Sequence, residues 1–370
     1  MGSADFPSLH FLCLRSVSIQ LFKANIGMNK IHNVNRIVRD YVRFGCLPIP
    51  KRMRDRIQET LSQTFREVQR WFEKHAELFP DGPRKQGRQR RADHLRLFFD
   101  YLQFDSEDMT INDKATATRI IQLNADWPQL QFQFACAYAS ESVLAEFDRI
   151  RLRVFRKNLT DHPLYDFWHT VLSDPDSESK LYNMNGLTPC QLVSLTFQWS
   201  ISNGFLEMVQ YLWRRVTDQQ REYIGMLQWR RVCASAKHGP TYAYLCQRLC
   251  LLNDTNLIRV TWQFFYESLL KLLDQSALPS TKETNYLRVC FILKYACPTL
   301  RTGLLRAQNY RALQLSMQSR DSRTFHLLQQ HLDPDRLSDA LIYLEATEGA
   351  NPNALIEARK AVVQRQWSHA

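Results

Sequence analysis

Hydrophobic residues recur every three or four positions along most of the chain. Between 51 and 78, Arg and Glu fill the positions between apolar residues that are spaced by three, four or six: Ile57, Leu61, Phe65, Val68, Phe72 and Leu78. This spacing places the apolar side chains on one stripe of a helix and the charged ones on the other face. Segments of similar character follow at 92–104, 115–123, 130–138, 142–155, 164–172, 257–273, 285–295, 310–317, 322–332, 336–347 and 354–367. The pattern therefore predicts an all-α chain.

Two proline-rich breaks organise the N-terminal part. Leu47-Pro48-Ile49-Pro50 ends an amphipathic segment at 29–44, because two alternate prolines cannot lie inside a helix. Pro80-Asp81-Gly82-Pro83 is a strong turn signal. The breaks predict four regions, which are a poorly ordered extension (1–27), a basic N-terminal helical region (28–79), a basic linker loop (80–91) and a helical-repeat domain (92–370).

Two similar units stand next to each other between 185 and 249. Each contains an apolar helix, a turn at a glycine and a second apolar helix, and the two glycines, Gly204 and Gly239, are 35 residues apart. A fixed period in this range is typical of helical repeat arrays. Apolar residues stand five and eight positions after the turns at Ala139, Gly204 and Arg320, whereas Gln247 interrupts this pattern after Gly239. We therefore expect degenerate repeats.

Three short motifs resemble the ankyrin-repeat family. They are Gly186-Leu187-Thr188-Pro189, the Asn203-Gly204 turn followed by Leu206-Glu207-Met208-Val209, and Gly349-Ala350-Asn351-Pro352-Asn353. The chain departs from the family where Cys190-Gln191 replaces the usual Leu-His, and where 16 residues separate Thr188 from Gly204. The resemblance implies a solenoid of stacked helix pairs that binds a partner protein along its surface. A plain all-α bundle and a different helical repeat remain the alternatives.

Nine cysteines are present, with no Cys-x-x-Cys spacing, and most lie in apolar segments. This usage is typical of buried free thiols in a reducing compartment. Cys246 and Cys250 share a helix face, but no histidine stands at a matching spacing, so neither a zinc site nor a cofactor is expected. No stretch reaches 18 apolar residues, which predicts no membrane span. We expect an intracellular protein, cytoplasmic or nuclear.

The net charge of +11 is concentrated at the N-terminus. Residues 1–96 hold 19 Lys and Arg against 9 Asp and Glu, whereas 97–370 hold 29 against 28. The linker loop carries a basic run that is a candidate targeting or nucleic-acid patch: Arg84, Lys85, Arg88, Arg90 and Arg91. A plain exposed loop is the alternative.

Motifs of enzymatic chemistry are missing from the sequence. It holds no GxGxxG, no P-loop, no GxSxG, no HExxH and no EF-hand loop, so we name no catalytic residue and expect no enzyme. Trp199, Trp213 and Trp229 are candidate partner contacts, with packing between repeats as the alternative. The first hypothesis is a non-enzymatic protein–protein interaction scaffold or adaptor. The second is a basic helical regulator that binds nucleic acid through 51–96, and an enzyme on an unfamiliar all-α scaffold is the third.

Overall fold

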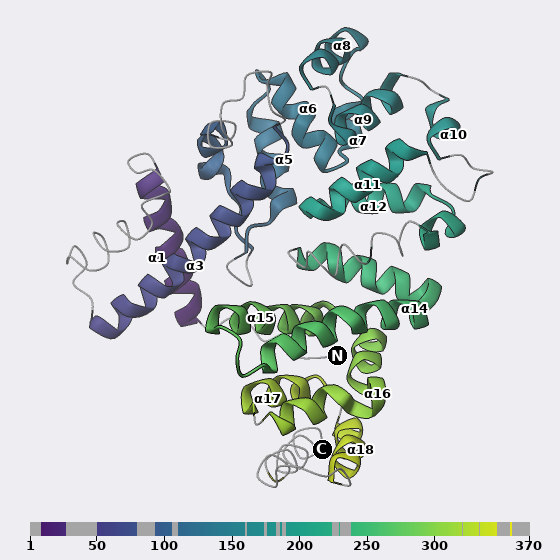
Figure 1. Cartoon of the computed structure of the whole chain (residues 1–370). Helices are drawn as coiled ribbons and strands as arrows, with labels where there is room; N and C mark the ends of the chain where they lie inside the picture. Colours follow the sequence, from purple (N-terminus) through teal and green to yellow (C-terminus); the bar gives the residue numbers. More distant parts are fainter. Residues whose placement is uncertain are drawn as a thin grey trace. The chain divides into compact units, whose positions relative to one another are not determined.

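The computed structural model describes most of the chain in separate stretches. The described residues are 9–26, 50–79, 93–105, 110–159, 161–173, 176–182, 186, 190–223, 229, 238–319, 321–332, 334–345 and 356. Their regular secondary structure is helical, and an isolated antiparallel bridge joins Phe104 to Ile111. The prediction of an all-α chain is confirmed for this part. The chain divides into two compact units, Met1–Pro175 and Asp176–Ala370 (Figure 1). The predicted boundaries at 27, 79 and 91 stay predictions.

The first unit is built on helix α3. In chain order it contains α1 (Leu9–Ile26), α3 (Lys51–Ala76), the 3-10 helix η3 (Asp93–Tyr101), α5 (Asp113–Leu123), α6 (Pro128–Ala137), α7 (Glu141–Leu144), α8 (Arg149–Asn158) and α9 (Pro163–Ser173). The apolar stripe predicted for 51–78 is the buried face of α3, from Ile57 to Trp71. Helices α1 and η3 both pack on α3, and α6 contacts α5, α7 and α9.

Helix α1 lies within 1–27, the segment for which the sequence predicts a poorly ordered extension. Leu14, Ser18 and Phe22 stand four residues apart and are buried, so they form one face of the helix. The Phe22 ring meets Phe65 of α3 edge-on, with ring centroids 5.3 Å apart, and lies 6.1 Å from the ring of Phe99. This aromatic contact packs α1 against α3.

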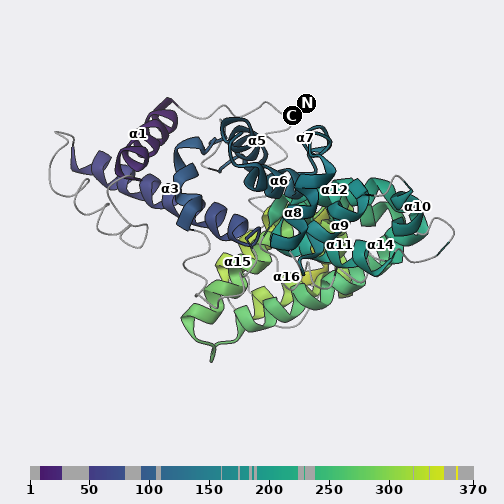
Figure 2. The same cartoon turned by 90° about the horizontal axis from the view of Figure 1, so that it is seen from above.

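The second unit continues with helix pairs and one long helix. It contains α10 (Ser177–Tyr182), α11 (Gln191–Asn203), α12 (Leu206–Arg215), α14 (Gly239–Leu273), α15 (Pro279–Tyr295), α16 (Pro298–Gln318), α17 (Ser322–Gln330) and α18 (Pro334–Glu345). Helices α15 and α16 both pack on α14 (Figures 1 and 2). No helix among the described residues is long and apolar enough to cross a membrane.

The turn between α11 and α12 is as predicted. Gly204 follows α11 with φ of +74°, and the N–H groups of Gly204 and Phe205 bond back to Ile201 and Ser200. This is the left-handed glycine ending of a helix, which costs a residue with a side chain about 1 kcal/mol. The other two motifs of the ankyrin resemblance, at 186–189 and 349–353, lie largely outside the described residues.

The regular repeat length is broken in the second unit. Two helices were expected at 241–249 and 257–273, but α14 runs through both as one helix of 35 residues. The polar residues between them include neither Gly nor Pro, so nothing in that stretch stops the helix. Helix α16 changes direction at 307–310, where Gln308, Asn309 and Tyr310 have positive φ. Stacked ankyrin-like repeats therefore stay a prediction.

Candidate functional site

Helix α8 presents the most cationic surface among the described helices. Asp148 precedes the helix and its side chain accepts a hydrogen bond from Arg151 N at 2.7 Å, which is an ordinary N-cap. Leu152 and Phe155 are buried, and the Phe155 ring lies 5.1 Å from Phe132 of α6. This anchor fixes which face of α8 points outward.

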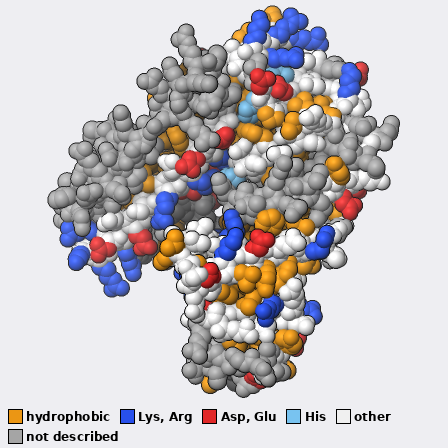
Figure 3. Space-filling model, viewed as in Figure 1, with side chains coloured by type: hydrophobic (Ala, Val, Ile, Leu, Met, Phe, Trp, Pro, Cys, Tyr) orange, Lys and Arg blue, Asp and Glu red, His pale blue; other side chains and the backbone are white. Residues whose placement is uncertain are grey.

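The outward face of α8 combines positive charge with apolar side chains. Five cationic residues of the helix are exposed: Arg149, Arg151, Arg153, Arg156 and Lys157. Ile150 and Val154 are 75% and 51% exposed, and their spacing of four places them side by side. The corresponding blue cluster with orange atoms nearby lies at the top of Figure 3. Such a surface offers both charge pairing and apolar contact.

The positive charge of α8 is poorly compensated within the helix. Asp148 lies 3.8 Å from Arg151, and both side chains are more than half exposed, so this pair contributes little. The first turn carries no acidic residue, and Arg149 and Arg151 there oppose the helix dipole. A carboxylate brought to this turn from outside would relieve both effects.

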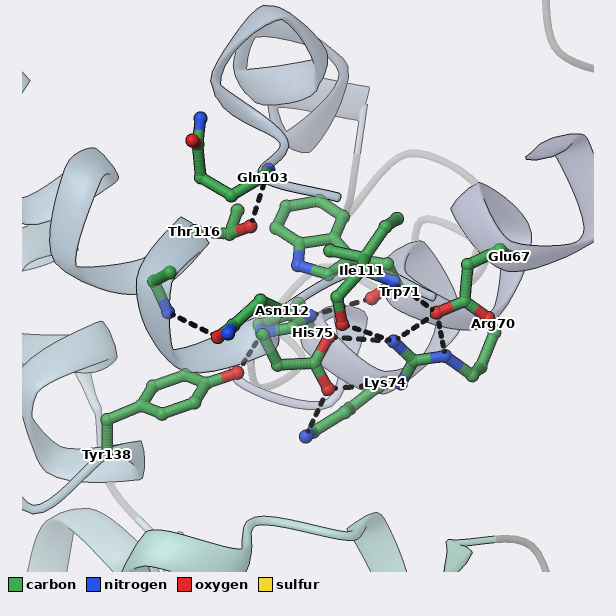
Figure 4. A network of polar contacts seen from close by, with 12 residues as sticks. Glu67, Arg70, Trp71, Lys74, His75, Gln103, Ile111, Asn112, Thr116 and Tyr138 are labelled. Carbon is green, nitrogen blue, oxygen red and sulfur yellow. Dashed lines mark hydrogen bonds and ion pairs between the residues drawn. The ribbon is translucent and has the colours of Figure 1, made fainter. Parts of the chain in front are cut away.

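A second group of charges lies at the packing centre of the first unit (Figure 4). Asp113, the first residue of α5, accepts hydrogen bonds from Arg70 at 2.7 and 3.0 Å and from Lys74 at 2.7 Å. Glu67 pairs with Arg70 at 2.7 Å and accepts from Ile111 N at 2.8 Å. Two cations meet two carboxylates, so this network is neutral and holds α3 against 111–113.

The ionisation of these groups is set by burial and by their partners. Burial alone would raise the pKa of Asp113, but the charges of Lys74 and Arg70 overcome it and hold that pKa well below its usual range. His75 is fully buried, which lowers its pKa to about 3. Its Nε2 lies 2.6 Å from Tyr138 Oη and its Nδ1 2.7 Å from Trp71 O. The carboxylate and the imidazole thus each have hydrogen-bond partners inside the unit, as in a structural network.

Three cysteines of the second unit form a thiol cluster. Cys246 and Cys250 come from α14, and Cys297 immediately precedes α16. Their sulfur atoms all lie within 4.8 Å of one another, and the Cys250 and Cys297 sulfurs are 3.0 Å apart. Hydrogen bonds from Cys246 and Cys250 lower the pKa of the Cys297 thiol, and the pKa of Cys246 is raised in turn. Among the described residues these are the ones that could hold a metal ion.

The three tryptophans expected to contact a partner lie largely inside the second unit. Trp229 is fully buried and donates to Thr261 Oγ1 at 2.8 Å. Trp213 is 5% exposed, and its ring lies tilted against that of Phe197 with the ring centroids 6.1 Å apart. Trp199 is half-buried and stacks on Phe205 at 5.1 Å. The Trp213 and Trp229 side chains are therefore buried within the second unit, and their role as partner contacts stays a prediction.

The predicted basic patch falls outside the described residues. This applies to Arg84, Lys85, Arg88, Arg90 and Arg91, about which the structure adds nothing. Sequence reasoning predicted a helix at 142–155 but did not single out its cationic surface, because the near-neutral total charge of 97–370 hid a local run of cations. The signal was the alternation Arg149-Ile150-Arg151-Leu152-Arg153 directly after a capping aspartate.

Comparisons with known proteins give no relative for this chain. No family model matches it, and neither a curated protein nor a solved structure matches.

Proposed function

We propose that this chain is a non-enzymatic protein–protein interaction scaffold whose α8 surface receives an acidic segment of a partner protein. The observation that carries the proposal is the exposure of Ile150 and Val154 among five cationic side chains. The chemistry that fits is a peptide segment with carboxylates flanking one or two apolar residues. The partner's identity is a matter for experiment.

The apolar pair favours a protein partner over a nucleic acid. Phosphate binding needs cations alone, and its contacts are spread along the backbone. Ile150 and Val154 have no role in such a contact, whereas an apolar side chain from a peptide would cover them. Covering each would contribute about 1 kcal/mol, since they are already partly shielded. The guanidinium groups would add charge-assisted hydrogen bonds to carboxylates.

The ion network of the first unit supports a structural rather than a catalytic role for the buried titratable groups. Asp113 and Glu67 neutralise Arg70 and Lys74, and His75 bonds to Tyr138 and to backbone. These contacts explain why charged groups lie inside the unit without invoking a reaction.

The proposal can be tested with synthetic peptides and the full chain. The probe is a fluorescent acidic peptide with two leucines four residues apart, and its control has serine at both leucine positions. We expect the leucine peptide to bind about tenfold more tightly at physiological salt, a difference of about 1.4 kcal/mol. Arg149→Glu/Arg153→Glu should abolish binding of both. Equal binding of the two peptides, or full binding by the charge-reversed variant, would refute the proposal.

A second candidate is a nucleic-acid regulator that uses the basic start of α3. Lys51 and Arg52 are exposed in its first turn, where no acidic residue balances them and Pro50 supplies no side-chain cap. Cations at a helix N-terminus oppose the dipole, and a bound phosphate would offset this. The salt dependence of the binding affinity distinguishes the two functions, because a protein that contacts phosphates loses affinity steeply as the salt concentration rises. Duplex binding that disappears in Lys51→Glu/Arg52→Glu, and not in the α8 variant, would favour this second candidate.

A further inference from the structure

Cys246 and Cys250 of α14 lie close to Cys297, the residue that precedes α16. Cys250 and Cys297 are separated by 47 positions, yet their sulfurs are 3.0 Å apart. The packing of α16 on α14 brings these two sulfur atoms together. We propose that these three side chains bind one thiophilic metal ion, Zn²⁺ or Cu⁺, and so link α14 to the start of α16.

The sulfur positions fit a three-thiolate site after a small adjustment. A tetrahedral zinc site with Zn–S bonds of about 2.3 Å places its sulfurs about 3.8 Å apart. All three sulfurs already lie within 4.8 Å of one another. The Cys250 and Cys297 sulfurs would have to move apart by about 0.8 Å, which a rotation about the side-chain torsions of half-exposed residues allows.

The surroundings of the cluster suit a bound thiolate. Cys297 N–H donates to Cys246 Sγ at 3.1 Å, so one backbone donor already points at a ligand atom. Donors of this kind orient thiolate ligands and share their charge. Cys297 also stands at the N-terminal end of α16, a helix of 21 residues, where the dipole favours negative charge. The Arg301 guanidinium, one turn on, bonds to Ala296 O at 2.9 Å and brings a positive charge to the same helix end.

Burial explains how an ion could enter and be held. Cys246 is fully buried, whereas Cys250 and Cys297 are half-buried, so the cluster lies at the edge of the packed interior. Each S–H gives its proton to solvent as its S–metal bond forms, so no oxidant or reductant is needed. Three protein ligands leave a fourth position on zinc for water, and they complete a three-coordinate site for Cu⁺. Soft thiolates select both ions over harder ones.

Sequence spacing alone argued against such a site. Cys246 and Cys250 share a helix face, but the third ligand is distant in sequence and is a cysteine, whereas the sequence-based expectation depended on a nearby histidine. Only the packing of α16 on α14 supplies Cys297. The earlier expectation of no zinc site therefore rested on two of the three ligands.

The test uses the full chain, prepared metal-free and reduced without oxygen. Co²⁺ is titrated as a spectroscopic probe for zinc, followed by competition with Zn²⁺, and a separate titration uses Cu⁺ buffered by a chelator. We expect one metal ion per chain, thiolate-to-cobalt charge-transfer absorption, and three sulfur neighbours by X-ray absorption of the unmodified protein. The last measurement does not depend on any variant folding.

Variants assign the ligands. Cys250→Ser and Cys297→Ser should each weaken binding at least about 100-fold, since each removes a bond to the metal. Cys290→Ser is the matched control, because Cys290 is a half-buried thiol of α15 in the same unit that is not part of the cluster. It should leave the affinity unchanged, and circular dichroism checks that each variant is folded.

Several results would overturn the proposal. One is a metal ion bound with fewer than three sulfur neighbours. Another is unchanged affinity in the Cys250→Ser/Cys297→Ser double variant, which would place the metal on other cysteines. A third is a reduced protein that binds neither ion but forms a Cys250–Cys297 disulfide in air, which would make the cluster a redox pair instead.

Discussion

The ion network around Asp113 makes the sharpest stability prediction. Asp113→Asn keeps the size of the side chain and removes the negative charge that Arg70 and Lys74 share. The amide oxygen can still accept one hydrogen bond, but it cannot neutralise two cations. Lys74 is the critical group, because its side chain is only 5% exposed and its ammonium group loses the carboxylate that lies 2.7 Å away.

The magnitude follows from the exposure of each partner. Breaking a buried pair by removing one member costs about 3–5 kcal/mol. Arg70 is about one-third exposed and can return to water, so its share is small. The loss for Lys74 dominates, and we expect Asp113→Asn to lower the free energy of unfolding of the first unit by about 3 kcal/mol. For a unit of this size, that corresponds to a fall in melting temperature of roughly 6–12 °C.

The assay is urea and thermal unfolding of the full chain, with Asp148→Asn as the matched control. Asp148 undergoes the same chemical change in an exposed pair with Arg151, and asparagine still caps α8. The control should cost under about 0.5 kcal/mol. Adding Lys74→Met to Asp113→Asn should recover part of the loss, because the buried ammonium charge is then gone. Equal effects of Asp113→Asn and Asp148→Asn would refute the view that the network is buried and structural.

Three further outcomes are expected. Burial lowers the pKa of His75 in the folded protein to about 3, whereas its pKa in the unfolded chain is about 6.5, so His75 binds a proton more readily in the unfolded chain at pH values below about 6.5. The contribution of His75 should therefore lower the free energy of unfolding by about 2 kcal/mol between pH 7 and pH 5. Urea unfolding of His75→Gln should show a correspondingly shallower pH dependence. Gly204→Ala should destabilise the second unit by about 2 kcal/mol in thermal unfolding, because it places a side chain at positive φ and against the His238 ring; an unchanged melting temperature would contradict that turn geometry. Ile150→Ser/Val154→Ser should leave the melting temperature within about 2 °C of the original while weakening the leucine peptide about tenfold, since both side chains are exposed.

The helices of the fold were largely readable from local pattern. The stripe at 51–78 corresponds to α3 at Lys51–Ala76, and the segment at 164–172 to α9 at Pro163–Ser173. The turn predicted at Gly204 is present, and this glycine has positive φ. These features depend on residues within one or two turns of one another, which is the range that periodicity and capping rules cover.

The features that needed the structure depend on distant residues. Arg70 and Asp113 are 43 positions apart, and Cys250 and Cys297 are 47 apart. Neither contact can be predicted from neighbouring residues in the sequence, because the packing of the helices decides which of their faces touch. The continuity of α14 also differs from the predicted pair of helices, because the polar stretch between them contains neither Gly nor Pro and is compatible with a helix.

Whether a candidate contact residue is buried or exposed also depends on residues that are distant in the sequence. Aromatic content predicted anchors for a partner, but Trp213 and Trp229 are used by the unit's own core. Burial of an aromatic side chain depends on neighbours that sequence spacing does not specify. The exposed cations and apolar pair of α8 were visible in the sequence, but their exposure became evident only once Phe155 and Leu152 were seen to face inward.

The central proposal is that α8 is a protein-binding surface that reads charge and apolar side chains together. The most direct measurement is the affinity of the full chain for the leucine-bearing acidic peptide, compared with Arg149→Glu/Arg153→Glu and with Ile150→Ser/Val154→Ser. The proposal predicts that both double variants bind at least about tenfold more weakly while their melting temperatures stay close to that of the unmodified chain. Unchanged affinity in the serine variant, with loss only on charge reversal, would contradict it and leave α8 as a general anion-binding surface.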